Sequence, residues 1–287
     1  MKKILFKGCG TAIATPFKES GEINYEELAR YLDFQLKNKI DAIIVCGTTG
    51  EAATLSKSEK EKLIKFTIKY VNKQVPVIAG TGSNNTKEAI QMSKFAQEAG
   101  ADGVLIVTPY YNKTTQEGLV KHYSEIAENI TIPIIIYNVP SRTGVNILPE
   151  TCKELSKISN IVAIKEASGN ISQVAKIAQL CQDDLNIYSG NDDQILPILS
   201  IGGNGVISVL SNIKPKEVHE IVKNYMEGET KKAKEEFIKN IPLINSLFCE
   251  VNPIPVKYAL KKIGFDFGKP RPPLYELKNK KEIDKFL

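Results

Sequence analysis

The feature that most constrains this fold is a regular alternation of short apolar runs and longer amphipathic segments over the first 225 residues. Eight runs have the length and the β-branched content of strands. They cover residues 11–15, 41–47, 75–80, 103–108, 133–138, 161–167, 186–189 and 205–209. Segments with helical spacing follow them, at 24–39, 58–72, 85–99, 115–129, 149–157, 170–181, 191–200 and 215–227.

Several of these runs are apolar at every position, as in Ile43-Ile44-Val45 and Ile134-Ile135-Ile136. Strands of this kind are buried on both faces, which is typical of parallel sheets covered by helices. Eight strand–helix units therefore predict an α/β fold, a (β/α)8 TIM barrel over residues 1–225. A doubly wound open sheet is the alternative, but six strands would suffice for it. The glycine-rich dinucleotide fingerprint is also missing after the first run.

The last part of the chain, residues 226–287, has a different character. Helical spacing occurs at 228–240, 241–249 and 254–263, followed by a proline-rich turn at 269–273 and a final short helix. No linker or low-complexity tract precedes it. We expect a C-terminal helical extension that packs on the barrel, and no second domain.

Composition excludes several classes of protein. Apolar residues make up 42% of the 287 residues and charged residues 25%, which excludes a disordered chain. The net charge of +5 comes from mixed signs without an arginine-rich arm, which argues against nucleic-acid binding. Five cysteines without C-x-x-C spacing predict reduced thiols. Because no apolar run reaches the ~18 residues of a membrane span, we expect no membrane segment and a cytoplasmic location.

One strand carries an unexpected charge: Lys165 lies inside the apolar run 161–167. A buried lysine without a partner loses its proton at low cost, and a neutral amine is a nucleophile. The alternative is a lysine near the strand end whose long side chain reaches water. These residues alone leave both interpretations open.

Polar side chains gather where the predicted strands end, which is where barrel enzymes place their sites. Thr48, Thr49, Tyr111 and Tyr137 could surround a small oxyacid with hydroxyl groups. Glycines flank Thr48-Thr49, so backbone N–H groups could approach a carboxylate, with the dipole of the following helix adding to the attraction. We therefore expect a site for a small organic acid.

Arg142 follows the fifth strand and is one of only three arginines in the chain. Its fork of N–H donors suits a carboxylate, whereas the alternative role is a hydrogen bond that stabilises the loop. His122 and His219 fall in predicted helices and are expected at the surface. No grouping of Asp, Glu and His predicts a metal site, and no flavin or nucleotide motif is present, so a neutral lysine would be the one strong reagent.

Six strings, in order along the chain, resemble the dihydrodipicolinate synthase/N-acetylneuraminate lyase family of class I aldolases. They are GTTGE at 47–51, TPYYN at 108–112, YNVPSRTG at 137–144, IKEASG at 164–169, SGND at 189–192 and GGNGVISV at 202–209. The resemblance covers nearly the whole chain. It implies that Lys165 forms a Schiff base with pyruvate and that no other cofactor is needed.

The resemblance also implies roles for the other residues. Its catalytic set is Lys165, Tyr137, Thr48 and Tyr111, with Tyr111 supplied by the partner subunit of a tight dimer, itself expected to pair into a dimer of dimers. Its substrate-binding set is Thr49, Ile207, Arg142 and Gly190. Arg142 would hold the carboxylate of L-aspartate 4-semialdehyde, which favours the synthase members. The product would be 4-hydroxy-tetrahydrodipicolinate, on the route to diaminopimelate and lysine.

A lysine feedback site is the third implication of the resemblance. Asn84, Glu88 and Tyr110 match it, but Lys57 and Lys60 stand where lysine-sensitive members have histidines. A cation there would repel the ammonium of an effector, so we expect weak inhibition by L-lysine or none. Two other functions stay open: a pyruvate-dependent lyase of sugar acids such as N-acetylneuraminate, and a non-catalytic barrel that senses a keto acid.

Overall fold

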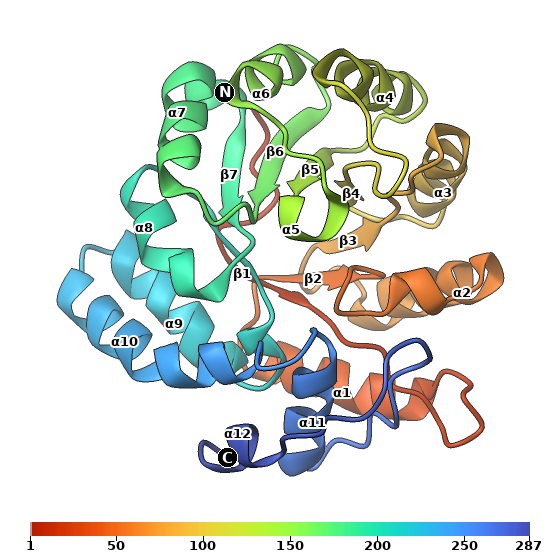
Figure 1. The fold of residues 1–287 in the computed structure, drawn as a ribbon, viewed down its shortest axis with the longest axis vertical. Coiled ribbons are helices and arrows are strands. Elements are labelled where there is room, and N and C mark those ends of the chain that lie inside the picture. The colour runs from red at the N-terminus through yellow and green to blue at the C-terminus, as the bar shows by residue number, and fades with distance from the viewer. Residues whose placement is uncertain (1) are drawn as a thin grey trace.

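The computed structural model describes residues 2–287, in which eight parallel strands close into a barrel in chain order (Figure 1). The strands are β1 (Gly8–Ala12), β2 (Ala42–Val45), β3 (Val77–Gly80), β4 (Gly103–Val107), β5 (Ile134–Asn138), β6 (Ile161–Glu166), β7 (Asn186–Ser189) and β8 (Gly205–Ser208). Pairing of β1 with β8 closes the sheet. The predicted (β/α)8 barrel is confirmed, and the open sheet is excluded.

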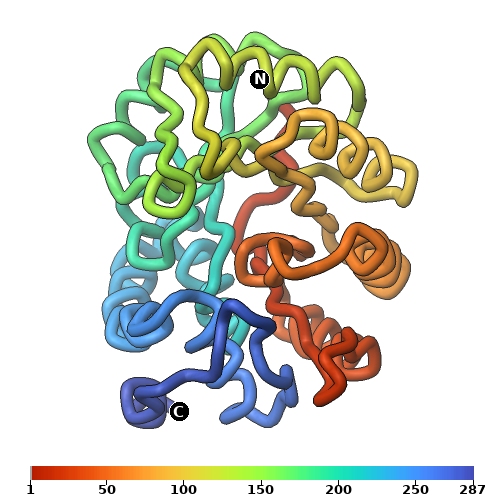
Figure 2. The backbone as a smooth tube through the Cα atoms, turned by 45° about the vertical axis from the view of Figure 1, so that its right-hand side comes forward, coloured from red at the N-terminus to blue at the C-terminus, as the bar shows by residue number. Residues whose placement is uncertain are grey.

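Helices surround the strands in a ring, which the ribbon in Figure 1 and the backbone tube in Figure 2 show from two directions. They are α1 (Tyr25–Lys37), α2 (Lys57–Val71), α3 (Thr86–Glu98), α4 (Gln116–Glu128), α6 (Pro149–Leu155), α7 (Ile171–Cys181), α8 (Ile195–Ser200) and α9 (Pro215–Met226). Capping side chains fix where several of them begin, because each accepts a backbone N–H that the helix leaves unpaired. Ser56, for example, forms a capping box with Glu59 at the start of α2.

Two cores explain why the strands are apolar at every position. Ile44 and Ile135 belong to a cluster inside the barrel, together with Tyr137 and Ile207. Their neighbours Ile43 and Ile134 belong to a second cluster, between the strands and the helices. Since successive side chains of a strand point to opposite faces, both faces need apolar residues. Several of the polar residues that the strands do carry are their last residues, such as Asn138 of β5, Glu166 of β6 and Ser189 of β7.

The first strand was expected three residues too late, at 11–15 instead of Gly8–Ala12. Glycines conceal its start, since Gly8 has φ of +122° and a Cβ there would lie 2.1 Å from Asp41 Oδ2. The prediction of separate helices at 228–240 and 241–249 is wrong as well. One helix, α10 (Thr230–Ser246), continues through Pro242.

The rest of the C-terminal part consists of α11 (Ile254–Lys262), the short α12 (Lys281–Asp284) and the segments between them. In Figure 1 these lie across the same end of the molecule as α1. Arg30 Nη2 of α1 donates to Gly264 O at 2.6 Å, and α10 packs on α9. The division of the chain at residue 225 stays a prediction.

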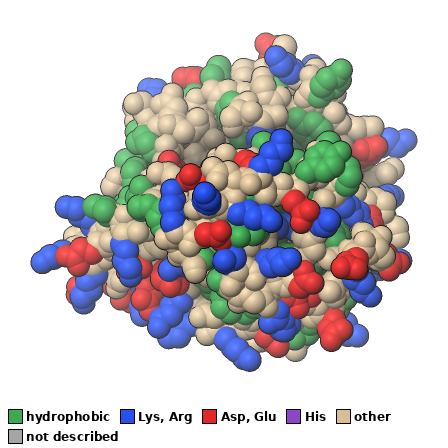
Figure 3. Space-filling model, turned by 60° about the horizontal axis from the view of Figure 1, so that its bottom comes forward, with side chains coloured by type: hydrophobic (Ala, Val, Ile, Leu, Met, Phe, Trp, Pro, Cys, Tyr) green, Lys and Arg blue, Asp and Glu red, His purple; other side chains and the backbone are tan. Residues whose placement is uncertain are grey.

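The surface carries both charge signs side by side. On the face in Figure 3, lysine and arginine side chains alternate with acidic ones. Many ion pairs are exposed and join residues three or four apart, such as Lys57 and Glu61 at 3.9 Å, and pairs of this kind stabilise little. Within residues 2–287, no helix has both the length and the apolar character to cross a membrane.

Candidate active site

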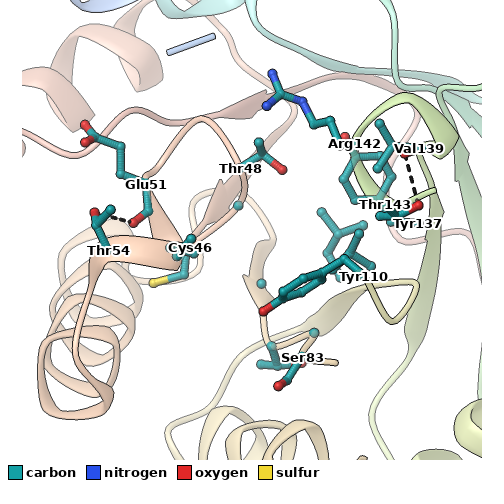
Figure 4. A pocket seen from close by; sticks show the side chains of 18 of the residues that line it. Cys46, Thr48, Glu51, Thr54, Ser83, Tyr110, Tyr137, Val139, Arg142 and Thr143 are labelled. Atoms are coloured by element: carbon teal, nitrogen blue, oxygen red, sulfur yellow. Dashed lines mark hydrogen bonds between the residues drawn. The ribbon is translucent and has the colours of Figure 1, made fainter. Parts of the chain in front are cut away.

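A cavity of about 420 Å³ opens where the strands end. The loops after β2, β3 and β4, the β5 end and its loop, and the C-terminal segment line it. Figure 4 shows Thr48, Tyr110, Tyr137 and Arg142 around its wall, on different loops and strands. Of the predicted residues, those that line the cavity are Thr48, Lys60, Glu88, Tyr110, Tyr137 and Arg142. The chain folds these distant polar residues into one hollow, as expected of a barrel.

Lys165, on β6, does not line this cavity itself but lies behind Tyr137. Its Nζ is 4.3 Å from the centroid of the Tyr137 ring. The side chain is 6% exposed, so it does not extend into solvent. Burial lowers the pKa of Lys165 to about 7, with Asp192 opposing the shift and Arg142 adding to it. A lysine with this pKa is roughly half neutral at pH 7, where an ordinary one is almost wholly protonated.

The surroundings of Lys165 leave its amine unpaired. Within the described chain, its Nζ takes part in no hydrogen bond or ion pair. Gly190 gives it room, because a Cβ at that position would lie 3.1 Å from Lys165 Cε and 2.7 Å from Ala167 Cβ. Ile207 on β8 is fully buried in the same inner cluster as Tyr137. The arrangement suits an amine that reacts with a carbonyl carbon, because nothing else binds it.

Tyr137, at the end of β5, separates the amine from the cavity. It is 7% exposed, and burial raises its pKa, while the charge of Arg142 and the neighbouring Thr48 hydroxyl act in the opposite direction. Thr48 is half-buried and lines the same hollow. Tyr137 therefore stays protonated at neutral pH and can give a proton to an atom held beside Lys165.

The loop Gly47–Glu51 is a tight turn that presents two threonines. Gly50 N donates to Gly47 O at 3.1 Å, and Glu51 N donates to Thr48 O at 3.1 Å. In the part of the chain that the structure describes, the N–H groups of Thr48 and Thr49 have no protein acceptor. These two groups are free for a carboxylate. The expected help from a helix dipole is wrong, because residues 52–54 form one 3-10 turn and α2 begins at Lys57.

Arg142 lies in α5 (Pro140–Thr143), a single turn after β5, and is exposed on the cavity wall. Its Nη2 donates to the backbone oxygen of Asn252 at 3.2 Å. This is the loop contact that we considered as an alternative role for Arg142. The remaining N–H groups of the guanidinium have no protein acceptor among residues 2–287, so both roles are compatible.

Tyr111 stands apart from the other predicted residues. It is 91% exposed, has φ of +70° and does not line the cavity of its own chain. A left-handed backbone is uncommon for a tyrosine. The ring therefore projects outward, where a second molecule could receive it.

Of the predicted effector residues, Tyr110 lies with Ser83 on the side of the cavity away from the Arg142 guanidinium (Figure 4). Asn84 Nδ2 donates to Tyr110 O at 3.1 Å, and Ser83 Oγ donates to Glu88 Oε2 at 3.0 Å. Lys60, Glu88 and Tyr110 line the cavity, whereas Lys57 is exposed and beside Glu61. Three of the five residues thus line the cavity, and Asn84 contacts one of these three.

The histidines were expected at the surface, which is wrong for His122. It is 5% exposed, and its Nδ1 is 2.9 Å from Thr86 Oγ1, which joins α4 to α3. Burial lowers the pKa of His122 to about 4. His219 is half-buried and lies 2.8 Å from Asp41. Among the residues described, no three His, Cys, Asp or Glu side chains are grouped as metal ligands.

Sequence reasoning assigned no role to three groups that the structure places at the site. Asp192 is 2% exposed, and its Oδ2 accepts from Val209 N and Leu210 N at 2.9 Å each. Asn252 and the ion pair of Glu51 with Lys257 come from the C-terminal segment and the Gly47–Glu51 loop. Asp192 follows the predicted strand 186–189 by three residues and could have been found by this position. Nothing in the sequence around Asn252 or Lys257 places them near the barrel mouth.

Comparison with known proteins adds a family to this geometry. The model described as the dihydrodipicolinate synthetase family matches residues 5–286. A relative from Caldicellulosiruptor saccharolyticus, named 4-hydroxy-tetrahydrodipicolinate synthase, is 59% identical over 285 residues, 99% of this chain and 96% of the relative.

Solved structures agree over nearly the full length. The dihydrodipicolinate synthase from Thermotoga maritima superposes with a TM-score of 0.95 at 45% identity, covering 98% of this chain and 96% of that one. A protein described as the first monomeric dihydrodipicolinate synthase variant gives the same TM-score and identity, over 98% of this chain and 94% of that one.

Proposed function

Since the chain belongs to the dihydrodipicolinate synthetase family and has the synthase activity for which its relatives are named, we propose that Lys165 carries this activity as the Schiff-base nucleophile. The reaction is the aldol condensation of pyruvate with L-aspartate 4-semialdehyde to 4-hydroxy-tetrahydrodipicolinate. It commits material to diaminopimelate and lysine biosynthesis. The enzyme is a lyase, and the sugar-acid lyase alternative is not favoured.

The observation that supports this role is the state of the Lys165 amine. It is buried, it has no hydrogen-bond partner in the described chain, and its pKa is about 7. Its nitrogen attacks the keto carbon of pyruvate, and loss of water gives an imine. Loss of a methyl proton then gives an enamine, whose carbon bonds to the aldehyde carbon of the second substrate. The amino group that came from the semialdehyde finally attacks the imine carbon, which closes the ring and releases the Lys165 amine. No other cofactor is needed for these steps.

Proton transfer is assigned to Tyr137, which lies between Lys165 and the cavity. Thr48, whose hydroxyl lies on the same cavity wall, passes the proton on. Tyr111 completes the relay from the partner subunit, since its ring projects away from its own cavity. The enzyme is accordingly a homo-oligomer built from a tight dimer, with a dimer of dimers as the expected assembly. The description of one relative as a monomeric variant supports oligomers as the usual state.

The two substrates carry one carboxylate each at opposite ends of the forming bond. The free N–H groups of Thr48 and Thr49 bind the carboxylate of pyruvate, while Ile207 and Gly190 border the chain beside Lys165. Arg142 binds the carboxylate of the semialdehyde with its unused N–H groups. Five free thiols and a biosynthetic role support a location in the cytoplasm.

The assay that tests the function follows product formation from pyruvate and L-aspartate 4-semialdehyde, with N-acetylneuraminate and keto-deoxy sugar acids as competing substrates. We expect turnover of the first pair alone. Cleavage of a sugar acid at a higher kcat/KM would contradict the assignment. Binding of pyruvate without turnover would instead favour the keto-acid sensor.

Feedback by L-lysine is expected to be weak or absent. Lys60 lines the same cavity as Glu88 and Tyr110 and adds a cation that would repel the ammonium of the effector. Initial rates measured over a range of L-lysine concentrations test this. Half-inhibition at an L-lysine concentration below about 1 mM, which corresponds to a binding free energy of about −4 kcal/mol or stronger, would contradict this expectation. It would show that Lys57 and Lys60 do not prevent binding.

A further inference from the structure

The C-terminal segment contributes one polar side chain to the cavity, that of Asn252. Val251 and Pro253 beside it also line the cavity. Asn252 is 4% exposed, although an amide buried in a protein is unfavourable unless it is hydrogen-bonded. Its hydrogen bonds therefore show what keeps it there.

Asn252 bonds to two residues that are distant in the sequence. Its Nδ2 donates to Thr49 Oγ1 at 2.9 Å, across 203 positions. Its backbone oxygen accepts from Arg142 Nη2 at 3.2 Å, across 110 positions. Thr49 and Arg142 are the groups assigned above to the carboxylates of the two different substrates. A single residue thus connects both carboxylate-binding groups.

We propose that Asn252 is a positioning residue that holds Thr49 and Arg142 at a fixed spacing, so that the two substrates meet in register above Lys165. The inference rests on the proposed function of Lys165, Thr49 and Arg142. Asn252 acts through these residues and bonds to no reacting atom itself. Because small errors in the placement of reacting groups slow a reaction strongly, this spacing matters for turnover.

A second cross-link fixes Asn252 from the other side. Lys257 Nζ donates to Glu51 Oε1 at 2.8 Å, two residues beyond Thr49. Lys257 N donates to Pro253 O at 3.0 Å, which ties that ion pair to the residue after Asn252. The segment 252–257 is therefore joined twice to the Gly47–Glu51 loop, which leaves Asn252 little freedom to move.

The same amide has a feature that a purely stabilising residue would lack. Asn252 Oδ1 is buried and has no hydrogen-bond partner among the described residues. A buried acceptor without a donor destabilises the folded state. The hydrogen bond to Thr49 is thus made at the expense of an unsatisfied oxygen, which favours a role in placing Thr49 over one in stability.

A double-mutant cycle tests the link to Thr49. We expect Asn252→Ala and Thr49→Val each to raise the KM for pyruvate about tenfold with a smaller change in kcat, the pattern of lost binding. The double variant should be no worse than the more affected single variant, because both changes remove the same contact. Multiplicative effects on KM would overturn the proposal.

A second cycle tests the link to Arg142. Asn252→Ala should also raise the KM for the semialdehyde, but it should have no further effect in an Arg142→Ala background. Glu250→Ala is the matched control: it removes the acceptor of Lys278 N and Asn279 N and loosens the same segment outside the cavity. An equal rise of KM in Glu250→Ala would mean general loosening and would contradict a specific role for Asn252.

Thermal unfolding and borohydride trapping separate the remaining outcomes. If Asn252→Ala lowers the Tm but leaves both KM values within twofold, Asn252 is structural and the proposal is wrong. If Asn252→Ala does not fold, Asn252→Asp takes its place, because aspartate has the same shape as asparagine. The negative charge of the aspartate should raise both KM values more than the alanine substitution does. Failure of the proposed function would show differently, as no trapped pyruvate in the unmodified enzyme.

Discussion

Two buried lysines, Lys165 and Lys257, have similar surroundings, but only Lys257 has an ion-pair partner. Each lies over an aromatic ring, Lys165 at 4.3 Å from the centroid of Tyr137 and Lys257 at 4.2 Å from that of Phe17. Burial lowers the pKa of both, to about 7 for Lys165 and about 8 for Lys257. The difference is the partner: Lys257 Nζ donates to Glu51 at 2.8 Å, and Lys165 has none.

The comparison shows that burial alone does not make a lysine reactive. Glu51 compensates the charge of Lys257 and accepts a hydrogen bond from its Nζ, so this amine stays charged. The ion pair holds the C-terminal segment against the Gly47–Glu51 loop. The Lys165 amine has no such acceptor, although Asp192 attracts it from a distance. An unpaired amine in a closed space is the one that loses its proton and reacts.

The largest effect is expected from Lys165→Met. Removing the nucleophile should lower kcat/KM by roughly 10⁴-fold or more. The free energy of unfolding should stay the same or rise, because the change removes an unpaired buried amine. Steady-state kinetics and urea unfolding on the same preparation measure both. Retention of a tenth of the activity would remove Lys165 from the mechanism.

The second-largest loss of activity is expected from Tyr137→Phe, which keeps the ring beside the Lys165 amine and removes the hydroxyl group. As the general acid and base, Tyr137 should contribute about 10²–10⁴-fold to kcat. Pyruvate binding should be affected far less. If kcat falls less than tenfold, Tyr137 is not the general acid and base, and its ring has only a packing role.

Lys257→Met tests whether the other buried lysine has a structural role. It leaves Glu51 buried without its cation, which costs roughly 3–5 kcal/mol of stability. A second change, Glu51→Gln, should restore part of that loss, because the stranded charge is gone. Urea unfolding of the two single variants and the double variant measures this. Equal destabilisation by Lys165→Met and Lys257→Met would contradict the distinction drawn between the two lysines.

The smallest effect concerns pH. Protonation of Lys165 removes the nucleophile, so kcat/KM for pyruvate should fall about tenfold per pH unit below about 7. Asp192 favours the protonated amine, so Asp192→Asn should lower the pKa and shift this acid limb to lower pH by up to about one unit. An acid limb that moves to higher pH, or stays in place, would show that Asp192 does not act on Lys165.

The sequence predicted the half of the site that lies on the barrel strands and the loops that follow them. Lys165, Tyr137, Thr48 and Arg142 follow a simple rule, since the ends of parallel strands meet at one face of a barrel. Asn252 and Lys257 follow no such rule, because their place depends on how the C-terminal segment returns to the mouth. The same limit explains β1, where Gly8 and Gly10 hide a strand from any pattern of apolar residues.

Trapping the imine tests the central claim most directly. The enzyme is treated with borohydride with and without pyruvate, digested, and its peptides are measured by mass spectrometry. A single reduced pyruvate adduct on Lys165, with Lys257 unmodified in the same sample, is the predicted result. An adduct on Lys257, or none on a folded enzyme, would contradict the assignment of the unpaired lysine as the nucleophile.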